Sequence, residues 1–435
     1  MRPSARIAAF IELIEKIEGG IAASGAPADS IVNTYFRERR YAGSKDRRTI
    51  SEWVYGYLRS RAYHLWALEN VGVEPAARYA VLSYLAVEAA DMLPLFGEEG
   101  GYGPDALTED EVDLIEKLQS FDTVPEEISA NIPEWAQAGF KERFGKHAIE
   151  AAKALNIAAS LDLRINKFKA KRDITDYLTL LPEGAERTPY SSLGLRSHTK
   201  PNLAGMKEYK AGEVEVQDEA AQLASLLVGA EPGMQVLDLC AGAGGKSLTV
   251  AGQMANKGQL YAMDVSRKRL RECEKRIERA GARNIQVKLL NMDAESRTEA
   301  LAGFKAACDR VYVDVPCTGT GTWRRSPDQR WRFSSENLSD MYAMQLGLLK
   351  EAAPLVKEDG RLIYMTCSVL PQENERIVSR FMKQQPEWKL VDYRNVWNEV
   401  LETEAPKSLS SMEECLQLAP HMHGTDGFFI AILQR

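Results

Sequence analysis

Two cysteines in this 435-residue chain stand where a covalent reaction could be carried out. Cys317 lies in the segment Asp314-Val-Pro-Cys-Thr-Gly-Thr-Gly321 and Cys367 lies in Tyr364-Met-Thr-Cys-Ser368, each directly after a predicted strand. The carboxyl ends of neighbouring parallel strands meet at one edge of a sheet, so we expect the two thiols to converge on one pocket. We interpret the other cysteines as small buried hydrophobes: Cys240, Cys273, Cys308 and Cys415.

The chemistry that suits such thiols is addition to a pyrimidine ring. C5 of cytosine is a poor nucleophile, but a thiolate that adds at C6 enables C5 to attack a sulfonium methyl group. An ordinary thiol has a pKa of about 8.5, and the positive charges of Lys246, Arg324 and Arg325 could raise the thiolate fraction at pH 7. Asp314 could hydrogen-bond the pyrimidine edge and stabilise its protonated form during the attack. The predicted catalytic residues are Cys367, Cys317, Asp314 and Lys246.

A glycine turn followed by two acidic strand ends indicates a nucleoside cofactor. The predicted strand 234–240 runs into Ala241-Gly-Ala-Gly-Gly245, whose glycines let the backbone approach a ligand next to a helix N-terminus. Asp264 ends the next strand, where its carboxylate could accept both hydroxyls of a ribose, and Asp293 follows the third strand, where it suits an adenine amino group. Because the turn leaves no room for a pyrophosphate, S-adenosylmethionine is favoured over NAD.

Two alternatives exist for this turn and the acidic strand ends. A phosphate-binding P-loop requires glycine where this chain has Cys240, so that interpretation fails. Asp264 and Asp293 could simply cap the following helices, but three matches in register favour the cofactor. The predicted cofactor-binding residues are Cys240, Ala241, Gly242, Gly244, Gly245, Lys246, Asp264, Arg269, Asp293 and Asp314.

The elements that must position these residues alternate between strand and helix from residue 234 onward. This alternation predicts an α/β fold with a parallel, doubly wound sheet of the Rossmann type. The expected strands are 234–240, 259–264, 285–290, 310–315 and 361–366, with a final edge strand at 427–433.

The N-terminal part has a different pattern. Residues 1–130 are expected to be all-helical, because Ile7, Phe10, Ile11 and Ile14 share one helix face and further helical stretches follow at 49–68, 76–92 and 108–120. A glycine- and acid-rich surface loop is expected at 96–104. A short helix at 133–144 and a strand at 161–166 then indicate a small α+β module over residues 131–214, before the main domain of 215–435.

Basic residues are clustered although the chain is acidic, with a net charge of −7 and a pI near 5.6. The clusters lie at 36–48, 164–172 and 323–332, and the third is interleaved with tryptophans. Each cluster alone could be a solvated surface, but three of them favour a polyanionic partner such as RNA. In the first cluster we expect phosphate contacts from Arg37, Arg39, Arg40, Lys45, Arg47 and Arg48.

Composition excludes several other classes of protein. Hydrophobic residues at 45% and charged residues at 27% are typical of globular chains. No apolar run approaches the ~20 residues of a membrane span, and the run Ile7–Ile11 is too short for a secretory signal. Six cysteines without a CxxC pair and five scattered histidines indicate neither a disulfide scaffold nor a metal site. We expect a monomeric cytoplasmic protein with reduced thiols, no metal and no membrane partner.

Taken together, these motifs resemble the RNA 5-methylcytosine methyltransferase family. The likeness covers about residues 160–435 and includes 164–169 and 216–219, and the family usually has Ala-Pro where this chain has Gly242-Ala243. In that family the cysteine of a Thr-Cys (TC) motif is the nucleophile, and the cysteine of a Pro-Cys (PC) motif assists product release. The resemblance implies these roles for Cys367 and Cys317, respectively. DNA cytosine methyltransferases attack with the PC cysteine instead. The matching segments are DLCAGAGGK (238–246), Asp264, DVPCTGTG (314–321), RRSPDQRW (324–331), TCS (366–368), ENE (373–375) and DGFF (426–429).

The N-terminal segment is similar to the NusB-like helical domain of the bacterial small-subunit ribosomal-RNA methyltransferase. Ser44–Arg48 and Val54–Arg59 carry this likeness. It implies RNA-binding roles for 1–130 and 131–214, and 16S ribosomal RNA as the favoured substrate for methylation at cytosine C5. The alternatives are a tRNA cytosine methyltransferase, a DNA methyltransferase, and a non-catalytic RNA-binding or assembly factor, although a mere binder does not need paired thiols.

Overall fold

The computed structural model describes the chain except for residues 99, 101, 122 and 200. It divides into two compact units. The first contains Met1–Ala158 and Thr322–Ser335, and the second contains Ala159–Gly321 and Glu336–Arg435. The four-stranded sheet of the predicted α+β module therefore groups with the second unit, while residues 131–158 group with the first. The division into three domains stays a prediction.

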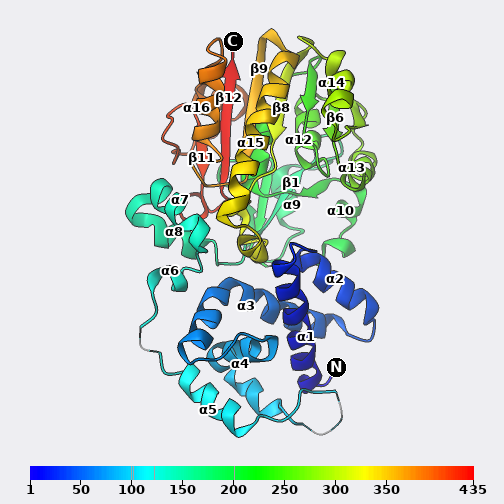
Figure 1. The fold of residues 1–435 in the computed structure, drawn as a ribbon. Helices are drawn as coiled ribbons and strands as arrows, with labels where there is room; N and C mark the ends of the chain where they lie inside the picture. Colours follow the sequence, from blue (N-terminus) through cyan, green and yellow to red (C-terminus); the bar gives the residue numbers. More distant parts are fainter. Residues whose placement is uncertain (99, 101, 122, 200) are drawn as a thin grey trace. The chain divides into compact units, whose positions relative to one another are not determined.

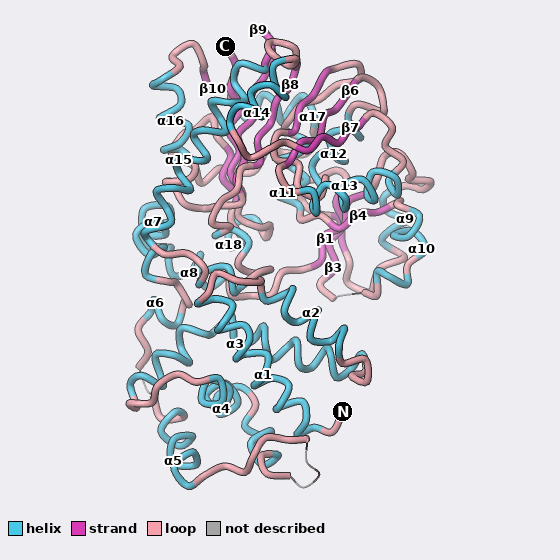
Figure 2. Tube along the Cα trace, turned by 45° about the vertical axis from the view of Figure 1, so that its right-hand side comes forward, coloured by secondary structure: helices cyan, strands magenta, loops and turns pink. Residues whose placement is uncertain are grey.

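The first unit is helical, as the sequence predicts, and no strand is assigned among its described residues (Figure 2). Its core is formed where apolar side chains of α1, α3 and α4 meet, among them Phe10, Tyr57 and Leu85. Helix α2 was not predicted, because its short apolar face ends inside a basic cluster. The helices are α1 (Pro3–Ala22), α2 (Ala28–Glu38), α3 (Ser44–Asn70), α4 (Ala77–Glu88), α5 (Glu109–Leu118), α6 (Glu126–Ser129), α7 (Glu134–Phe144) and α8 (Ala148–Ala154).

The segment 322–335 is part of this unit's interior. Arg330 is fully buried and donates to the carbonyl of Asn131 at 2.9 Å and to Oδ1 of Asn156 at 2.6 Å. Trp323 is also buried and stacks on Phe140 with ring centroids 5.4 Å apart. The expectation that cluster 323–332 forms a polyanion-binding face is therefore wrong for these two side chains, because both are used in packing.

The second unit begins with a small antiparallel sheet whose strand order is β2-β3-β1-β4. Two short helices, α9 and α10, pack with it around a core that includes Leu163, Tyr177 and Leu195. The elements are β1 (Leu161–Ile165), α9 (Ile174–Leu178), β2 (Glu186–Arg187), β3 (Gly194–Ser197), α10 (Lys207–Ala211) and β4 (Val214–Val216).

The large sheet of the second unit has the order β10-β12-β9-β8-β5-β6-β7, with β11 paired to β12 (Figure 1). The strands β5 to β9 are parallel, as predicted, and β8 lies beside β9. The strands are β5 (Gln235–Asp238), β6 (Gln259–Asp264), β7 (Ile285–Leu289), β8 (Cys308–Asp314), β9 (Val356–Thr366), β10 (Lys389–Val391), β11 (Leu416–Leu418) and β12 (Phe428–Gln434).

The last strand differs from the prediction in its position. β12 runs antiparallel between β9 and β10, so it is not at the edge of the sheet. The short strand β10 was not predicted, because three residues are too few to show a strand pattern. Ile430 belongs to the core on one side of the sheet, and Phe429 belongs to the core on the other. Both faces of β12 are therefore buried, which accounts for its continuous hydrophobic sequence.

Helices cover both faces of this sheet and complete the doubly wound architecture (Figures 1 and 2). Chain order reverses between β5 and β8, so the carboxyl ends of these strands form the switch point where ligands bind in such folds. The helices are α11 (Glu219–Leu226), α12 (Gly245–Gln253), α13 (Arg267–Ala280), α14 (Ala294–Ala302), α15 (Ser335–Ala352), α16 (Glu375–Gln384), α17 (Tyr393–Val400) and α18 (Pro420–His423).

Candidate active site

A cavity of about 870 Å³ opens at the carboxyl ends of the parallel strands. Carboxylates from three strand ends line it: Asp238 of β5, Asp264 of β6 and Asp314 of β8. Both predicted reactive cysteines, Cys317 and Cys367, lie on its wall. The cavity also contains most of the predicted cofactor-binding residues: Cys240, Ala241, Gly242, Gly245, Lys246, Asp264, Arg269 and Asp314.

The glycine turn after β5 needs glycine for two different reasons. Gly242 has a φ of +55°, and a Cβ there would point into open space at the cavity wall. Gly244 has a φ of +78°, and a Cβ there would lie 2.4 Å from Sγ of Cys273 on α13. Gly244 is not among the lining residues, and its close approach to Cys273 gives it a packing role.

Asp264 fixes the turn and faces the cavity. Its Oδ2 accepts a hydrogen bond from the Gly242 N–H at 2.8 Å, and its Oδ1 accepts one from the Ser266 N–H at 2.7 Å. Each oxygen keeps a lone pair for another donor. The carboxylate can therefore receive both hydroxyls of a ribose while it holds the glycine turn in place.

Asp293 lies elsewhere. It is exposed, it is not among the residues that line the cavity, and its side chain accepts from the Ser296 N–H at 2.8 Å as the N-cap of α14. Helix capping, the alternative weighed from the sequence, is the geometry observed. The Ser296 hydroxyl and the same N–H hold the pKa of Asp293 below its usual value.

Lys246 and Asp314 form an ion pair across the cavity floor, with Nζ and Oδ2 2.6 Å apart. The ring of Phe428 lies 5.0 Å from the same ammonium, so the DGFF segment contributes to its position. Burial opposes the charge on Lys246, but Asp314, and then Cys367, raise its pKa. Lys246 therefore stays positively charged beside Cys367.

The two thiols meet, as the strand order predicts. Sγ of Cys317 and Sγ of Cys367 are 3.3 Å apart, although the residues are 50 positions apart in sequence. The hydrogen bond to Cys367, together with burial, raises the pKa of the Cys317 thiol well above its ordinary value. Cys317 thus retains its proton at neutral pH.

Asp238 was not predicted from the sequence. It is buried at the end of β5, where burial raises its pKa to about 7 although the hydroxyls of Ser247 and Tyr312 donate to it at 2.6 and 2.7 Å. Other lining residues come from helices that packing brings to the site, and no sequence signal marked them. These residues are Arg297 from α14 and Met344, Gly347, Leu348 and Glu351 from α15.

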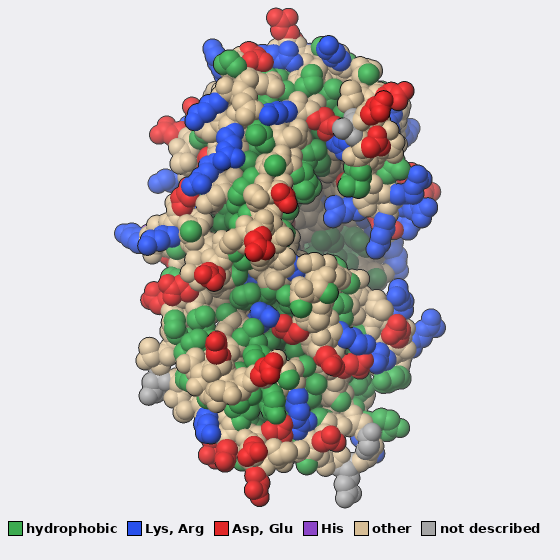
Figure 3. All heavy atoms as spheres, in the orientation of Figure 1, with side chains coloured by type: hydrophobic (Ala, Val, Ile, Leu, Met, Phe, Trp, Pro, Cys, Tyr) green, Lys and Arg blue, Asp and Glu red, His purple; other side chains and the backbone are tan. Residues whose placement is uncertain are grey.

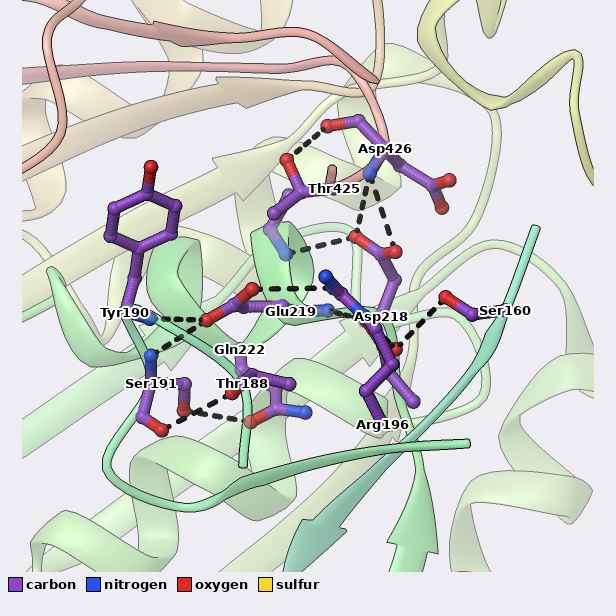
Figure 4. Close-up of polar contacts among 12 residues, drawn as sticks. Ser160, Thr188, Tyr190, Ser191, Arg196, Asp218, Glu219, Gln222, Thr425 and Asp426 are labelled. Carbon is purple, nitrogen blue, oxygen red and sulfur yellow. Dashed lines mark hydrogen bonds and ion pairs between the residues drawn. The ribbon is translucent and has the colours of Figure 1, made fainter. Parts of the chain in front are cut away.

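A buried polar network holds the cavity wall on the side of the small sheet (Figure 4). Arg196 makes two 2.8 Å bonds to Asp162 and contacts Glu219 at 3.3 Å. Asp218, which lines the cavity, accepts from the N–H of Asp426 at 3.1 Å. The QDE segment 217–219 and the DGFF segment 426–429 are thereby joined beside the cavity.

These observations fit S-adenosylmethionine. A Cβ at Gly242 would occupy the open space beside the turn, which glycine leaves for a ligand. Asp264 suits a ribose diol, and the apolar side chains of Met292, Met344 and Leu348 suit a purine face. Among the described residues, no group of three or more His, Cys, Asp or Glu could hold a metal ion.

Comparison with known proteins agrees with this geometry. The family described as 16S rRNA methyltransferase RsmB/F matches residues 225–434. The probable ribosomal RNA small subunit methyltransferase B of Synechocystis sp. is 32% identical over 310 residues, which cover 70% of this chain and 67% of the relative. The chain belongs to this family. The corresponding protein of Bacillus subtilis is 28% identical over 397 residues, which cover 89% of this chain and 83% of the relative.

Solved structures show that this RsmB/F family member also shares its fold with known proteins. The crystal structure of PH0851 matches with a TM-score of 0.78 and 25% identity, covering 100% of this chain and 99% of that one. NSun6 from Pyrococcus horikoshii, solved with SFG, matches with a TM-score of 0.59 and 20% identity, covering 70% and 98%. The large sheet is that of class I methyltransferases, and the cofactor is S-adenosylmethionine.

The remaining predicted residues and segments are placed as follows. Arg324 and Arg325, proposed as neighbours of the thiols, belong to the first unit, where the carbonyl of Arg324 accepts from Arg59 at 3.2 Å. In cluster 164–172, Arg164 is buried and bonds Gln217 at 2.6 Å. No helix in the described part of the chain is both long and apolar enough to cross a membrane.

Proposed function

We propose that this protein methylates C5 of a cytosine in small-subunit ribosomal RNA through a covalent adduct between Cys367 and C6. The observation that carries the proposal is the pair of thiols 3.3 Å apart on the wall of the cofactor cavity. One thiol alone would suit many reactions, but a nucleophile and a second thiol at contact distance suit addition followed by elimination. The names of the relatives support ribosomal RNA as the substrate.

The arrangement of charges favours Cys367 as the nucleophile. Cys317 holds its proton, which makes it the poorer nucleophile of the pair. Lys246 carries a positive charge that interacts with the same sulfur. Cys367 therefore adds to C6, and the electrons of the C5–C6 double bond make C5 nucleophilic.

The other side chains act on the pyrimidine and on the end of the reaction. S-adenosylmethionine supplies an electrophilic methyl group when bound. Asp314, oriented by Lys246 at 2.6 Å, accepts a hydrogen bond from the protonated pyrimidine edge while Cys367 attacks. After methylation, a water molecule takes the proton from C5, the C5–C6 double bond re-forms, and Cys367 leaves C6 as a thiolate. Cys317 assists this elimination by donating its S–H hydrogen bond to the departing sulfur. Asp264, Gly242 and Arg269 hold the cofactor in this proposal.

The direct test is methyl transfer to defined RNA. Purified protein is incubated with methyl-labelled S-adenosylmethionine and either unmodified 16S ribosomal RNA or a pool of unmodified tRNA, and the product is mapped by bisulfite sequencing. We expect label at one or a few protected cytosines of the ribosomal RNA. Label in the tRNA instead would identify tRNA as the substrate. Label in an RNA whose cytosines all remain sensitive to bisulfite would exclude methylation at C5.

A further inference from the structure

Glu373 is a buried carboxylate to which the proposed reaction assigns no role. It lies just before α16 and is fully buried. Within the described part of the chain, the donors that bind it are neutral groups rather than cations, and they belong to Thr318, Ser368 and Gln345. A buried charge without a counter-ion is costly to desolvate, so its donors must satisfy it closely.

The donors come from the two loops that carry the thiols. The Thr318 N–H and hydroxyl donate to Glu373 at 2.9 and 2.5 Å, and Thr318 directly follows Cys317. The hydroxyl of Ser368, which directly follows Cys367, donates to the same oxygen as the Thr318 hydroxyl. One carboxylate thus binds the residue after each thiol.

Further bonds complete the attachment of the two loops. The amide of Gln345 donates to Glu373 and to the carbonyl of Pro316, both at 3.0 Å, so the residues on both sides of Cys317 are tied to this carboxylate. The Gly321 N–H donates to the carbonyl of Cys367 at 3.0 Å, which joins the loops a second time. The hydroxyl of Tyr364 in β9 donates to the Glu373 carbonyl at 2.6 Å and anchors the carboxylate's own backbone.

We propose that Glu373 is a positioning residue that holds the loops after β8 and β9 together, so that Cys317 and Cys367 stay in contact. This inference rests on the proposed two-thiol reaction for its purpose, but the positioning can be measured without RNA. Charge-assisted bonds to a carboxylate are stronger than those to a neutral amide, so Glu373→Gln weakens the attachment while it preserves the volume of the side chain.

The probe is phenylarsine oxide, which condenses with two neighbouring thiols to form two As–S bonds and release one water. The reagent is kept limiting, and its addition to the intact protein is followed by mass spectrometry. An adduct that forms in the wild type but in neither Cys317→Ala nor Cys367→Ala is assigned to the pair of thiols. We expect the wild-type protein to form this adduct, and Glu373→Gln to form it at least about tenfold more slowly, because a displacement of ~1 Å can cost ~100-fold in rate.

The matched control is Glu213→Gln. Glu213 is a buried carboxylate beside the small sheet, where it accepts from the hydroxyl of Tyr177 on α9 at 2.8 Å, and Tyr177 belongs to the core of that sheet. This variant should bridge arsenic at the wild-type rate. Wild-type bridging in Glu373→Gln, with circular dichroism showing a folded protein, would overturn the proposal.

A second variant keeps the test decisive if Glu373→Gln does not fold. Thr318→Val removes one hydroxyl donor without changing the shape of the side chain, and should slow bridging by a smaller factor. Unchanged bridging in folded Thr318→Val would then overturn the proposal. Normal bridging in the wild type without RNA methylation would remove the proposed function and leave the positioning role standing.

Discussion

At the scale of single residues, the two thiols have different surroundings. The Cys367 sulfur and burial keep the proton on Cys317, and Lys246 is charged beside Cys367. The sequence predicted that these side chains meet, because strand ends determine where a loop residue lies. It did not predict Asp238 or Glu351, because only the packed structure shows which strand and helix residues face the cavity.

Asp264→Ala is expected to weaken S-adenosylmethionine binding about ten- to hundredfold, since removal of a charge-assisted hydrogen bond costs ~1.5–3 kcal/mol. RNA affinity should change little. Calorimetry of cofactor binding measures the effect, with Asp293→Ala as the control because that carboxylate is exposed and caps α14. Equal affinities for the wild type and folded Asp264→Ala would refute the ribose contact.

Asp238 should make the stability of the protein depend on pH. Its pKa is about 7 in the folded state, above the ~3.9 of an unfolded chain, so the folded state binds more protons and stability falls as pH rises between these values. From pH 5 to pH 7 the decrease in stability from this group is at most about 2–3 kcal/mol.

Asp238→Asn removes this titration. Denaturant unfolding at pH 5, 6, 7 and 8 should show the wild type losing stability relative to the variant up to about pH 7 and a constant difference above it. Parallel pH profiles over the whole range would show that Asp238 is already ionised at pH 5.

At the scale of elements, strand and helix periodicity carried most of the prediction. The five parallel strands and the helices α1, α3, α4, α5 and α7 lie where the pattern placed them. β12 also forms where the pattern predicts, but it is not at the edge of the sheet. A strand's neighbours depend on long-range pairing, here with β9 and β10, which a local pattern does not contain. The prediction of a polyanion-binding face at 323–332 was wrong for a similar reason. Charge alone cannot distinguish a surface arginine from Arg330, whose guanidinium is buried and bonded to a backbone carbonyl.

The contact between the glycine turn and α13 offers a test at this scale. Gly244→Ala should destabilise the protein by about 1–3 kcal/mol, because alanine is strained at a φ of +78° and its Cβ would overlap the Cys273 sulfur. The double variant Gly244→Ala with Cys273→Ala removes the overlap and should recover part of the stability. Thermal unfolding measures the stability of each variant. If the loss of stability in the double variant equals the sum of the losses in the two single variants, overlap with the Cys273 sulfur is not the cause.

At the scale of the whole molecule, the acidic chain carries a cationic groove on its first unit. A hollow of about 510 Å³ is lined by Arg37, Arg40, Arg47 and Arg48. Figure 3 shows basic side chains gathered over the helix α2, with acidic ones among them. Asp46 lies in the same segment but is buried and paired with the N-terminal amine and Arg6, so it does not neutralise the groove.

We expect this groove to bind RNA phosphates. Charge reversal of Arg37 and Arg40 should weaken RNA binding and reduce the slope of log affinity against log salt by about one unit for each phosphate that the variant no longer binds. Filter binding at several salt concentrations gives the slope, and Lys383→Glu, an exposed position on the second unit outside the three basic clusters, serves as a charge-matched control for a single reversal. An unchanged slope would identify the groove as a solvated surface.

The central claim, that Cys367 attacks and Cys317 releases, is tested most directly by trapping the adduct. Each protein is incubated with S-adenosylmethionine and unmodified 16S ribosomal RNA, and then run on a denaturing gel. Cys317→Ala should form a slowly migrating RNA–protein species, because attack proceeds and elimination stalls. Cys367→Ala and the double variant should form none. An adduct in Cys367→Ala together with none in Cys317→Ala would show that the PC cysteine attacks, and would contradict the assignment of the two thiols.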